Sequence, residues 1–192
     1  LTRLGNLDVL ECISLATQNI SHGQVLEISE PPHSATKKHW RRVISGKFAG
    51  LFGAGAQSAA YWGDADNLTA SILFSFGEHI GIAVQLKTDL NELGHKNIVK
   101  QKIKNKELWS PICFLLNECM TKNQRLEISK KMQNEFEDDE NINEILNLFD
   151  EHDLTDIIKS EAENELKMAK GCLLNLEIDT SALLHLTQFS VI

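Results

Sequence analysis

The amino-acid sequence predicts an all-α protein, and three observations support this prediction. Apolar residues recur at helical spacing along most of the chain, whereas alternating β-branched residues are scarce. Only 3 Pro and 11 Gly interrupt the 192 residues, which suits long helices. Hydrophobic residues make up 42% of the chain, enough to bury a substantial core. We therefore expect one all-α domain over residues 1–192.

The first half of the chain is expected to form three long helices. Residues 6–28 carry apolar side chains at helical spacing. Pro31 and Pro32 end this helix, because a proline ring removes a backbone donor and restricts the preceding residue. A second helix over residues 35–62 is rich in Gly and Ala, which permits the close approach of another helix or a ligand. A third helix, over residues 68–92, is apolar on most sides and should be buried.

The second half is expected to hold further helices after a basic connector. The stretch GHKNIVKQKIKNK, residues 94–106, is rich in lysine and is interpreted as a connector without regular structure. The helical periodicity of the remaining chain predicts helices over residues 107–120, 122–136, 141–149, 152–176 and 181–192.

Charge and composition exclude several classes of function. The net charge of −8 argues against nucleic acid as the main partner. No apolar run reaches the ~18 residues that a membrane span needs, and no signal peptide opens the chain. The 4 Cys lack CxxC spacing, which favours buried, reduced thiols in a cytoplasmic protein. The chain begins without Met inside an amphipathic pattern, so we interpret it as a fragment or as a longer protein that lacks its first part.

The stretch GEHIGIAVQLKTDLNEL, residues 77–93, contains the first group of candidate site residues. Gln85, Asp89 and Glu92 are spaced by four and three residues, which stacks them on one helical face. Mg²⁺ prefers oxygen ligands and often bridges one or two carboxylates to substrate phosphates. Asp89 and Glu92 are therefore candidate metal ligands, while Gln85 can only hydrogen-bond. The pattern fits a solvated helix end equally well.

Two more candidates lie in the first two predicted helices. Gln24 and Glu27 in HGQVLEI are three residues apart and face the same way, so they line either a cavity or a surface stripe. Lys47 lies in mid-helix among small and apolar residues, where its ammonium needs a partner or a route to solvent. A diphosphate would be such a partner.

Two charged clusters complete the candidates. The basic connector concentrates positive charge in an acidic protein, as a phosphate clamp would, although an exposed loop fits the same composition. The acidic run FEDDENINE, residues 136–144, is interpreted as a solvated turn. The lysines of the basic connector are Lys96, Lys100, Lys102, Lys104 and Lys106.

The order of these motifs resembles the C-terminal part of the isoprenyl diphosphate synthase (polyprenyl synthetase) family. HGQVLEI resembles the family's GQxxDL, and KKHWRRVISGKFAGLF resembles its helix with a KTAxLF motif. GEHIGIAVQLKTDLNELGHK resembles GxxxGxxFQixDDxxDxxGK, and KNKELWSPICFLL resembles KxTxPxxxAL. The resemblance implies a class I isoprenoid synthase type of helical bundle around a central cavity, with the N-terminal helices absent from this chain. It also implies a homodimer.

The resemblance assigns one set of residues to the diphosphate of an allylic isoprenyl substrate. Lys47 would contact this diphosphate, and Lys96 and Lys106 would close over it. Gln24 and Glu27 would line the wall of the same site.

A second set of roles follows from the match to the family's second aspartate-rich motif. Gln85 would lie near the allylic substrate, and Asp89 and Glu92 would match the second and third acids of DDxxD as Mg²⁺ ligands. Thr88 replaces the first aspartate of this motif, and a threonine hydroxyl is a weaker Mg²⁺ ligand than a carboxylate. Phe48 replaces a threonine that helps to place the substrate. Mg²⁺ and lysines would draw charge from the leaving diphosphate as the allylic cation forms.

The expected function is therefore that of a prenyltransferase or prenyl diphosphate synthase acting on an allylic isoprenyl diphosphate. Its acceptor would be isopentenyl diphosphate or a peptide, since ComQ-type enzymes that prenylate a pheromone tryptophan share the loose second motif. A non-catalytic regulatory or accessory relative of the same fold is the alternative. A terpene-cyclising relative ranks last, because the chain has no clear NDxxSxxxE-type signature.

Overall fold

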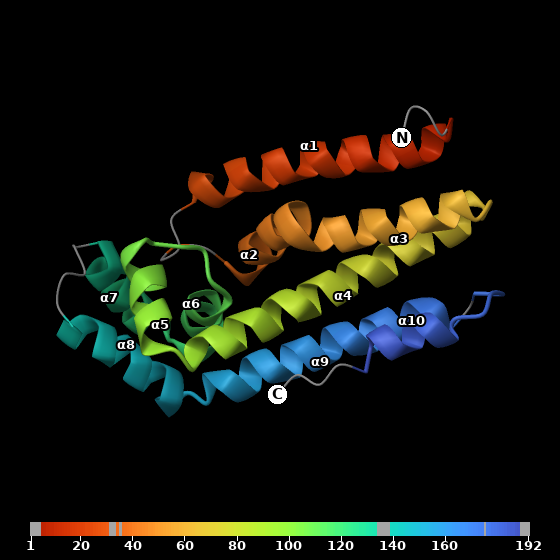
Figure 1. The fold of residues 1–192 in the computed structure, drawn as a ribbon. Coiled ribbons are helices and arrows are strands. Elements are labelled where there is room, and N and C mark those ends of the chain that lie inside the picture. Colours follow the sequence, from red (N-terminus) through yellow and green to blue (C-terminus); the bar gives the residue numbers. More distant parts are fainter. Residues whose placement is uncertain (1–4, 31–33, 35, 134–138, 175, 189–192) are drawn as a thin grey trace.

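A computed structural model describes residues 5–30, 34, 36–133, 139–174 and 176–188. All regular structure in these residues is helical, which confirms the predicted all-α class. The long helices α1, α3, α4 and α9 run side by side along the molecule, and α5 to α8 gather at one end (Figure 1). The elements are α1 (Leu7–Ser29), α2 (Lys37–Ile44), η1 (Ser45–Ala49), α3 (Gly50–Trp62), α4 (Asn67–Leu93), α5 (Lys96–Lys104), α6 (Ser110–Phe114), η2 (Leu115–Cys119), α7 (Lys122–Gln133), α8 (Asp139–Glu151), α9 (Leu154–Leu173) and α10 (Ser181–Leu186).

Polar side chains fix where the first helices begin. Asn6 accepts a hydrogen bond from the backbone N–H of Val9 at 3.1 Å and starts α1. Thr36 caps α2, and Asp66 accepts from the Thr69 N–H at 2.7 Å at the start of α4. Each cap satisfies an N–H that has no partner inside its helix.

The elements α2, η1 and α3 form one continuous helical rod with a wide turn in it. The η1 segment is a π-helix, in which Gly50 N–H bonds to the carbonyl of Ser45, five residues back. A Cβ on Gly50 would lie 2.6 Å from that carbonyl oxygen, so the wide turn requires a glycine there. The predicted single helix over 35–62 is thus confirmed from residue 37 onward, with a π-turn that the sequence pattern did not reveal.

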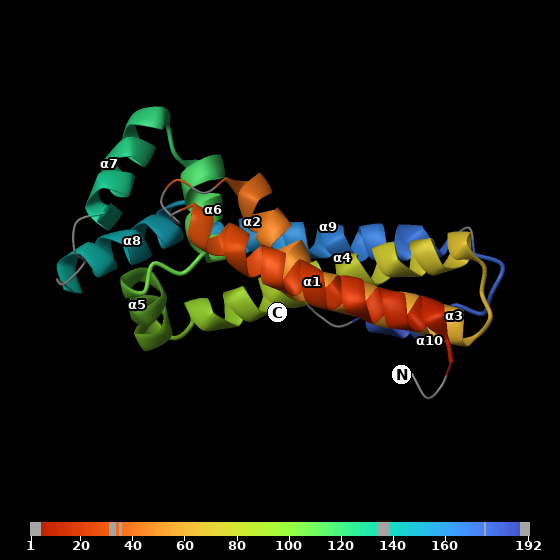
Figure 2. The same ribbon diagram turned by 90° about the horizontal axis from the view of Figure 1, so that it is seen from above.

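Glycines on α4 allow η1 and α3 to pack closely against it. A Cβ on Gly77 would lie 2.4 Å from the Phe52 carbonyl oxygen, and one on Gly81 would lie 2.6 Å from the Ala49 Cα. The predicted helix over 68–92 is therefore buried mainly between α3 on one side and α9 on the other. The view from above shows α1 crossing over α3 and α4 (Figure 2).

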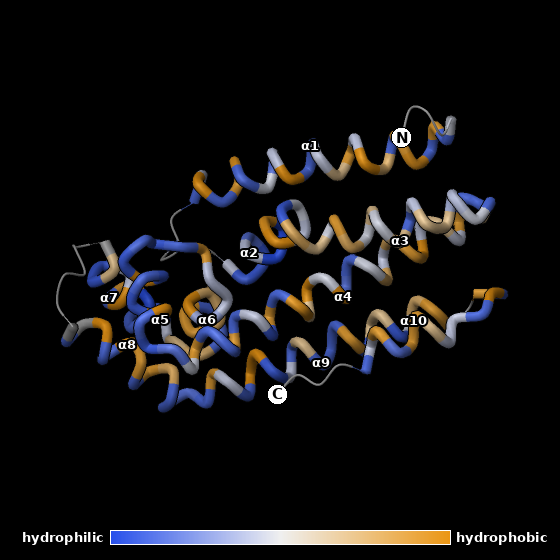
Figure 3. Tube along the Cα trace, viewed as in Figure 1, coloured by the Kyte–Doolittle hydropathy of each residue, from blue (hydrophilic) through white to orange (hydrophobic). Residues whose placement is uncertain are grey.

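The core gathers apolar side chains from helices along the whole chain. Figure 3 shows hydrophobic residues alternating with hydrophilic ones along α1, α4 and α9, the pattern of helices with one buried face. No described helix has the length and apolar character needed to cross a membrane. The largest fully buried side chains include Trp40, Phe76, Trp109, Phe114, Ile142 and Ile158.

Several expectations about the second half need correction. The basic connector over 94–106 is mostly helix, because Val99 and Ile103 are spaced by one helical turn and are buried together. The helix expected over 107–120 begins only at Ser110 and ends in a second π-helical segment. Within the described residues, the last helix ends at Leu186. Residues 136–138 of the acidic run lie outside the described residues, while 139–144 belong to α8 and form no turn.

The expectation of buried thiols is only partly right. All four cysteines are free, and Cys12 and Cys113 are buried. Cys119 and Cys172 are partly exposed and pack against the edge of the hydrophobic core.

Candidate functional site

Gln24, Glu27 and Lys47 form one polar cluster between α1 and η1. The Glu27 carboxylate oxygen Oε2 accepts from the Lys47 ammonium and from Gln24 Nε2, the latter at 2.9 Å. A Cβ on Gly23 would lie 2.8 Å from the Lys47 backbone nitrogen, so Gly23 lets the two segments meet here. The Lys47 side chain is 29% exposed, so it is not sealed inside the core.

Glu27 of this cluster also lines a pocket of about 380 Å³ that reaches the loop after α5. Its walls include Glu27 and Glu30 from the end of α1, and Asn105 and Lys106 from the loop. Lys106 is exposed and has a backbone φ of 53°. The structure therefore brings Lys106 and Glu27 to one pocket, although they are far apart in the sequence.

Asp89 is buried and fully hydrogen-bonded. Its Oδ1 accepts from Gln85 Nε2 at 2.8 Å, and its Oδ2 accepts from the N–H of Ser110 at 3.2 Å and from the Ser110 hydroxyl. Only 1% of Asp89 is exposed. Burial raises the pKa of this carboxyl to about 6, although the hydrogen bonds from Ser110 and Gln85 act in the opposite direction. Through these hydrogen bonds, Asp89 connects α4 to the start of α6.

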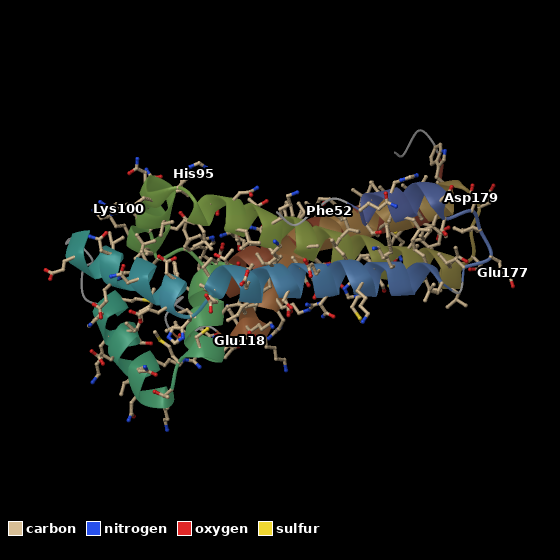
Figure 4. The ribbon with its side chains drawn as sticks, turned by 90° about the horizontal axis from the view of Figure 1, so that it is seen from below. Phe52, His95, Lys100, Glu118, Glu177 and Asp179 are labelled. Atoms are coloured by element: carbon tan, nitrogen blue, oxygen red, sulfur yellow. The ribbon has the colours of Figure 1, made fainter. Side chains whose placement is uncertain are left out.

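Glu92, the other predicted metal ligand, is held by a lysine. Lys102 Nζ lies 3.1 Å from Glu92 Oε2 and 3.2 Å from Glu107 Oε2, and it lies over the Trp109 ring. Lys96 opens α5 and is exposed. In Figure 4, the labels of His95 and Lys100 mark this end of the molecule, and Glu177 and Asp179 lie at the opposite end.

Thr88 and Phe48, the two residues that depart from the family motifs, both make contacts within the chain. The Thr88 hydroxyl donates to the Val84 carbonyl at 2.9 Å and is exposed. The Phe48 ring packs against Phe52, with ring centroids 5.3 Å apart, so it supplies an apolar surface next to Lys47.

The described residues do not by themselves fit a magnesium ion. The described residues contain no group of three His, Cys, Asp or Glu side chains placed to hold a metal. Both Asp89 oxygens already accept hydrogen bonds away from solvent, and Glu92 is ion-paired with Lys102. Magnesium needs near-octahedral oxygen ligands and keeps several waters, for which this buried carboxylate leaves no room.

Sequence reasoning missed Ser110 and did not distinguish Lys102 from the other lysines of the basic segment. Ser110 anchors Asp89, and the Ser-Pro pair of KNKELWSP, typical of a helix start, was a signal for its position. Lys102 is the lysine of the basic segment that reaches Glu92, whereas Lys96 and Lys106 had been singled out. Its spacing from the other lysines gave no indication of this.

Comparisons with known proteins agree with this fold. The solved polyprenyl synthase from Roseobacter denitrificans superposes with a TM-score of 0.87 at 22% identity, over 99% of this chain and 64% of its own. The decaprenyl diphosphate synthase from Rhodobacter capsulatus gives 0.86 at 24% identity, over 99% of this chain and 61% of its own. A Caulobacter crescentus polyprenyl synthase, solved with calcium and isoprenyl diphosphate, superposes with a TM-score of 0.84 at 18% identity, over 99% of this chain and 60% of its own. The chain therefore has the class I isoprenoid synthase fold.

The sequence itself defines the family. Residues 1–149 match the polyprenyl synthetase family model, and the chain belongs to this family. It is 36% identical to the Escherichia coli octaprenyl diphosphate synthase over 93 residues, which cover 47% of this chain and 28% of the relative. It is 24% identical to the Cyanophora paradoxa prenyl transferase over 94% of this chain and 56% of the relative. The chain thus spans between about a quarter and three fifths of its curated relatives.

Proposed function

We propose that this chain binds the diphosphate of an allylic isoprenyl diphosphate, as part of a prenyltransferase of the prenyl diphosphate synthase type. The observation that carries the proposal is the Gln24–Glu27–Lys47 cluster at the edge of the pocket that contains Lys106. The four side chains come from three separate segments, namely α1, η1 and the loop after α5, and two of them are cations. Membership of the polyprenyl synthetase family supports this substrate class.

The chemistry proposed for these residues is charge stabilisation. A diphosphate carries more negative charge than the Glu27 carboxylate, so it would compete for the Lys47 ammonium. Lys47 and Lys106 would then stabilise the negative charge that grows on the leaving diphosphate as its bond to the allylic carbon breaks. The Gln24 amide can donate to the same group, and Phe48 offers an apolar contact to the hydrocarbon.

Titration calorimetry with an allylic thiodiphosphate, which resists ionisation, tests this proposal. The Lys47→Gln variant should bind at least about tenfold more weakly than the unmodified chain. Lys167→Gln is the matched control, because Lys167 is an exposed lysine on α9, remote from the pocket. Equal affinity in the Lys47 variant and the unmodified chain would overturn the proposal.

Catalysis itself is tested by release of diphosphate with two alternative acceptors. Isopentenyl diphosphate as acceptor would mark a chain-elongating enzyme, and a tryptophan-containing peptide would mark a peptide-modifying one. The assay includes magnesium, so that any ligands supplied from outside the described residues can contribute.

A non-catalytic relative of the family is the second candidate, and one observation favours it. Thr88 donates its hydroxyl to the helix backbone and Asp89 is buried, so α4 presents little to a metal. This candidate predicts thiodiphosphate binding that does not change when magnesium is added, and no diphosphate release with either acceptor. Metal-dependent binding would exclude it.

A further inference from the structure

Two adjoining hollows lie between α1, α3 and α4, and the Lys47 cluster lines neither of them. Their volumes are about 410 Å³ and 260 Å³. Both are lined by Asn19, Gly50 and Phe74, so they form one continuous depression, the α1–α4 groove. Gly50, required by the π-turn, also keeps the floor of this groove free of a side chain.

One end of the α1–α4 groove is lined by polar and charged side chains. Arg41 and Arg42 from α2 and His22 from α1 line the larger hollow. Arg41 donates from both terminal nitrogens to the carboxylate of Glu165, with Nη2 to Oε2 at 3.1 Å. This fork fixes the Arg41 guanidinium and offsets much of its charge.

Arg42 is the cation left to interact with a ligand. It is exposed, and no described carboxylate forms an ion pair with it. Glu78 is the acidic side chain that lines the hollow, and its charge acts on Arg41. The amide of Asn19 and the hydroxyl of Ser45 lie in the same wall and can donate to an anion.

The other end of the α1–α4 groove is mainly apolar. Leu15 and Ala16 from α1 face Ala54 from α3 and Phe74 from α4. Leu15 is 50% exposed, although it borders a hollow lined by apolar side chains. The polar groups here include Gln57, which already accepts a hydrogen bond from the Cys12 thiol at 3.3 Å. A ligand that covers Leu15 and Phe74 would gain hydrophobic burial.

We propose that the α1–α4 groove binds an amphipathic anion, with its head at Arg42 and its hydrocarbon chain between Leu15 and Ala54. The head is a single carboxylate or phosphate, because it meets two neutral donors and Arg42, which has no ion pair among the described residues. The joined hollows have the size of an ordinary small-molecule site. This site differs from the one proposed for the allylic diphosphate, because Lys47, Glu27 and Lys106 do not line it.

Titration calorimetry with four short probes below their micelle concentrations tests the proposal. Octanoate and octyl phosphate carry both features, whereas octanol and inorganic phosphate carry one each. At least one of the two amphipathic anions should bind about tenfold or more tightly than octanol and inorganic phosphate. Which of them binds more tightly identifies a fatty-acid or a phosphate ligand. If no probe binds, or if octanol binds as tightly as the anions, the proposal is wrong.

Three variants locate the binding. Arg42→Gln should weaken the anions about tenfold and leave octanol unchanged, and Leu15→Gln should weaken both anions and octanol. Lys38→Gln is the control, because Lys38 is an exposed cation on the same helix that does not line the groove. Lys47→Gln should leave octanoate and octyl phosphate binding intact. Loss of anion binding in the Lys47 variant, or its retention in the Arg42 variant, would overturn the assignment and leave the proposed function standing.

Discussion

Asp89 of α4 accepts hydrogen bonds from both the backbone N–H and the hydroxyl of Ser110, the first residue of α6. Replacing Asp89 with Ala would leave this buried N–H without an acceptor, which costs about 1–3 kcal/mol. Asp89→Asn keeps an acceptor for Ser110, and Gln85 can turn its amide to match. We therefore expect the Ala variant to unfold at a clearly lower urea concentration than the Asn variant. Equal loss in both variants would contradict this role.

The raised pKa of Asp89 also predicts a pH dependence of stability. Its pKa is about 6 in the folded chain, against a usual 3.8, so the folded state binds more protons between these values. The free energy of unfolding contributed by this group is therefore highest at acid pH. It should fall by about 3 kcal/mol as the pH rises through 6. Denaturation curves of the unmodified chain and Asp89→Asn between pH 4 and about 7 check this, because the Asn variant lacks this slope.

Glu27 should restrain Lys47 in the absence of ligand. Glu27→Gln removes the carboxylate that now holds the Lys47 ammonium and that would repel a diphosphate. We expect this variant to bind an allylic thiodiphosphate several-fold more tightly without metal, the opposite of Lys47→Gln. Its effect on stability should stay within about 1 kcal/mol, because the pair is partly exposed. Calorimetry measures the affinity, and weaker binding in Glu27→Gln would show that the carboxylate assists the ligand.

Glu165 connects three helices through one buried carboxylate. It accepts from Arg41 of α2 and contacts His79 Nδ1 of α4 at 2.7 Å, while its own side chain is 3% exposed. Glu165→Gln should cost about 2–4 kcal/mol at neutral pH, because it leaves the Arg41 guanidinium without its charge partner and weakens the contact with His79. Glu163→Gln, an exposed position on the same helix, should change stability by less than about 0.5 kcal/mol. Similar unfolding midpoints for the two variants would disprove the connection.

The pH dependence of this contact has the opposite sign to that of Asp89. Burial alone would raise the pKa of Glu165, but hydrogen bonds from His79 and Arg41 outweigh burial and lower it. The stability from this group is therefore present above the usual glutamate pKa and is lost as the pH falls through the lowered value. Acid unfolding of the unmodified chain, compared with Glu165→Gln, measures this contribution.

Two glycines offer a matched test of helix packing. Gly77→Ala would place a Cβ 2.4 Å from the Phe52 carbonyl oxygen, whereas a Cβ on Gly55 meets nothing within 4 Å. We expect Gly77→Ala to destabilise the chain by about 1–3 kcal/mol or more, since α3 must move. Gly55→Ala should stabilise it by about 0.5–1 kcal/mol, because alanine favours the helix. Thermal unfolding of both variants checks the two signs.

Much of the fold could be predicted because it depends on local patterns. Apolar spacing and prolines located α1 and the α2–α3 rod within a few residues. Residues 94–106 were expected to form an irregular connector because of their many lysines. The spacing of four residues between Val99 and Ile103 was nevertheless a helical signal. The π-turn at residues 45–49 could not be predicted, because periodicity over so short a span does not separate five-residue from four-residue hydrogen bonding.

The candidate site could be predicted only in part. Motif order brought attention to Lys47 and Glu27, and the structure places them in contact. The same reasoning assigned Asp89 to a metal, whereas its neighbour is Ser110, 21 residues away. Which partner a carboxylate takes depends on how α4 and α6 pack, and no local spacing contains that information.

The wide turn at Ser45–Ala49 sets the angular relation between the two halves of one rod. An α-helix advances about 100° per residue, and the π-turn holds one residue more than an α-helical turn. Deleting one residue here would allow regular α-helical hydrogen bonding to continue through the turn. It would also rotate the first half of the rod relative to the second. Arg41 could then no longer face Glu165 while Lys47 faced Glu27. One residue of extra length thus lets a single helix direct an arginine and a lysine independently toward two different neighbours.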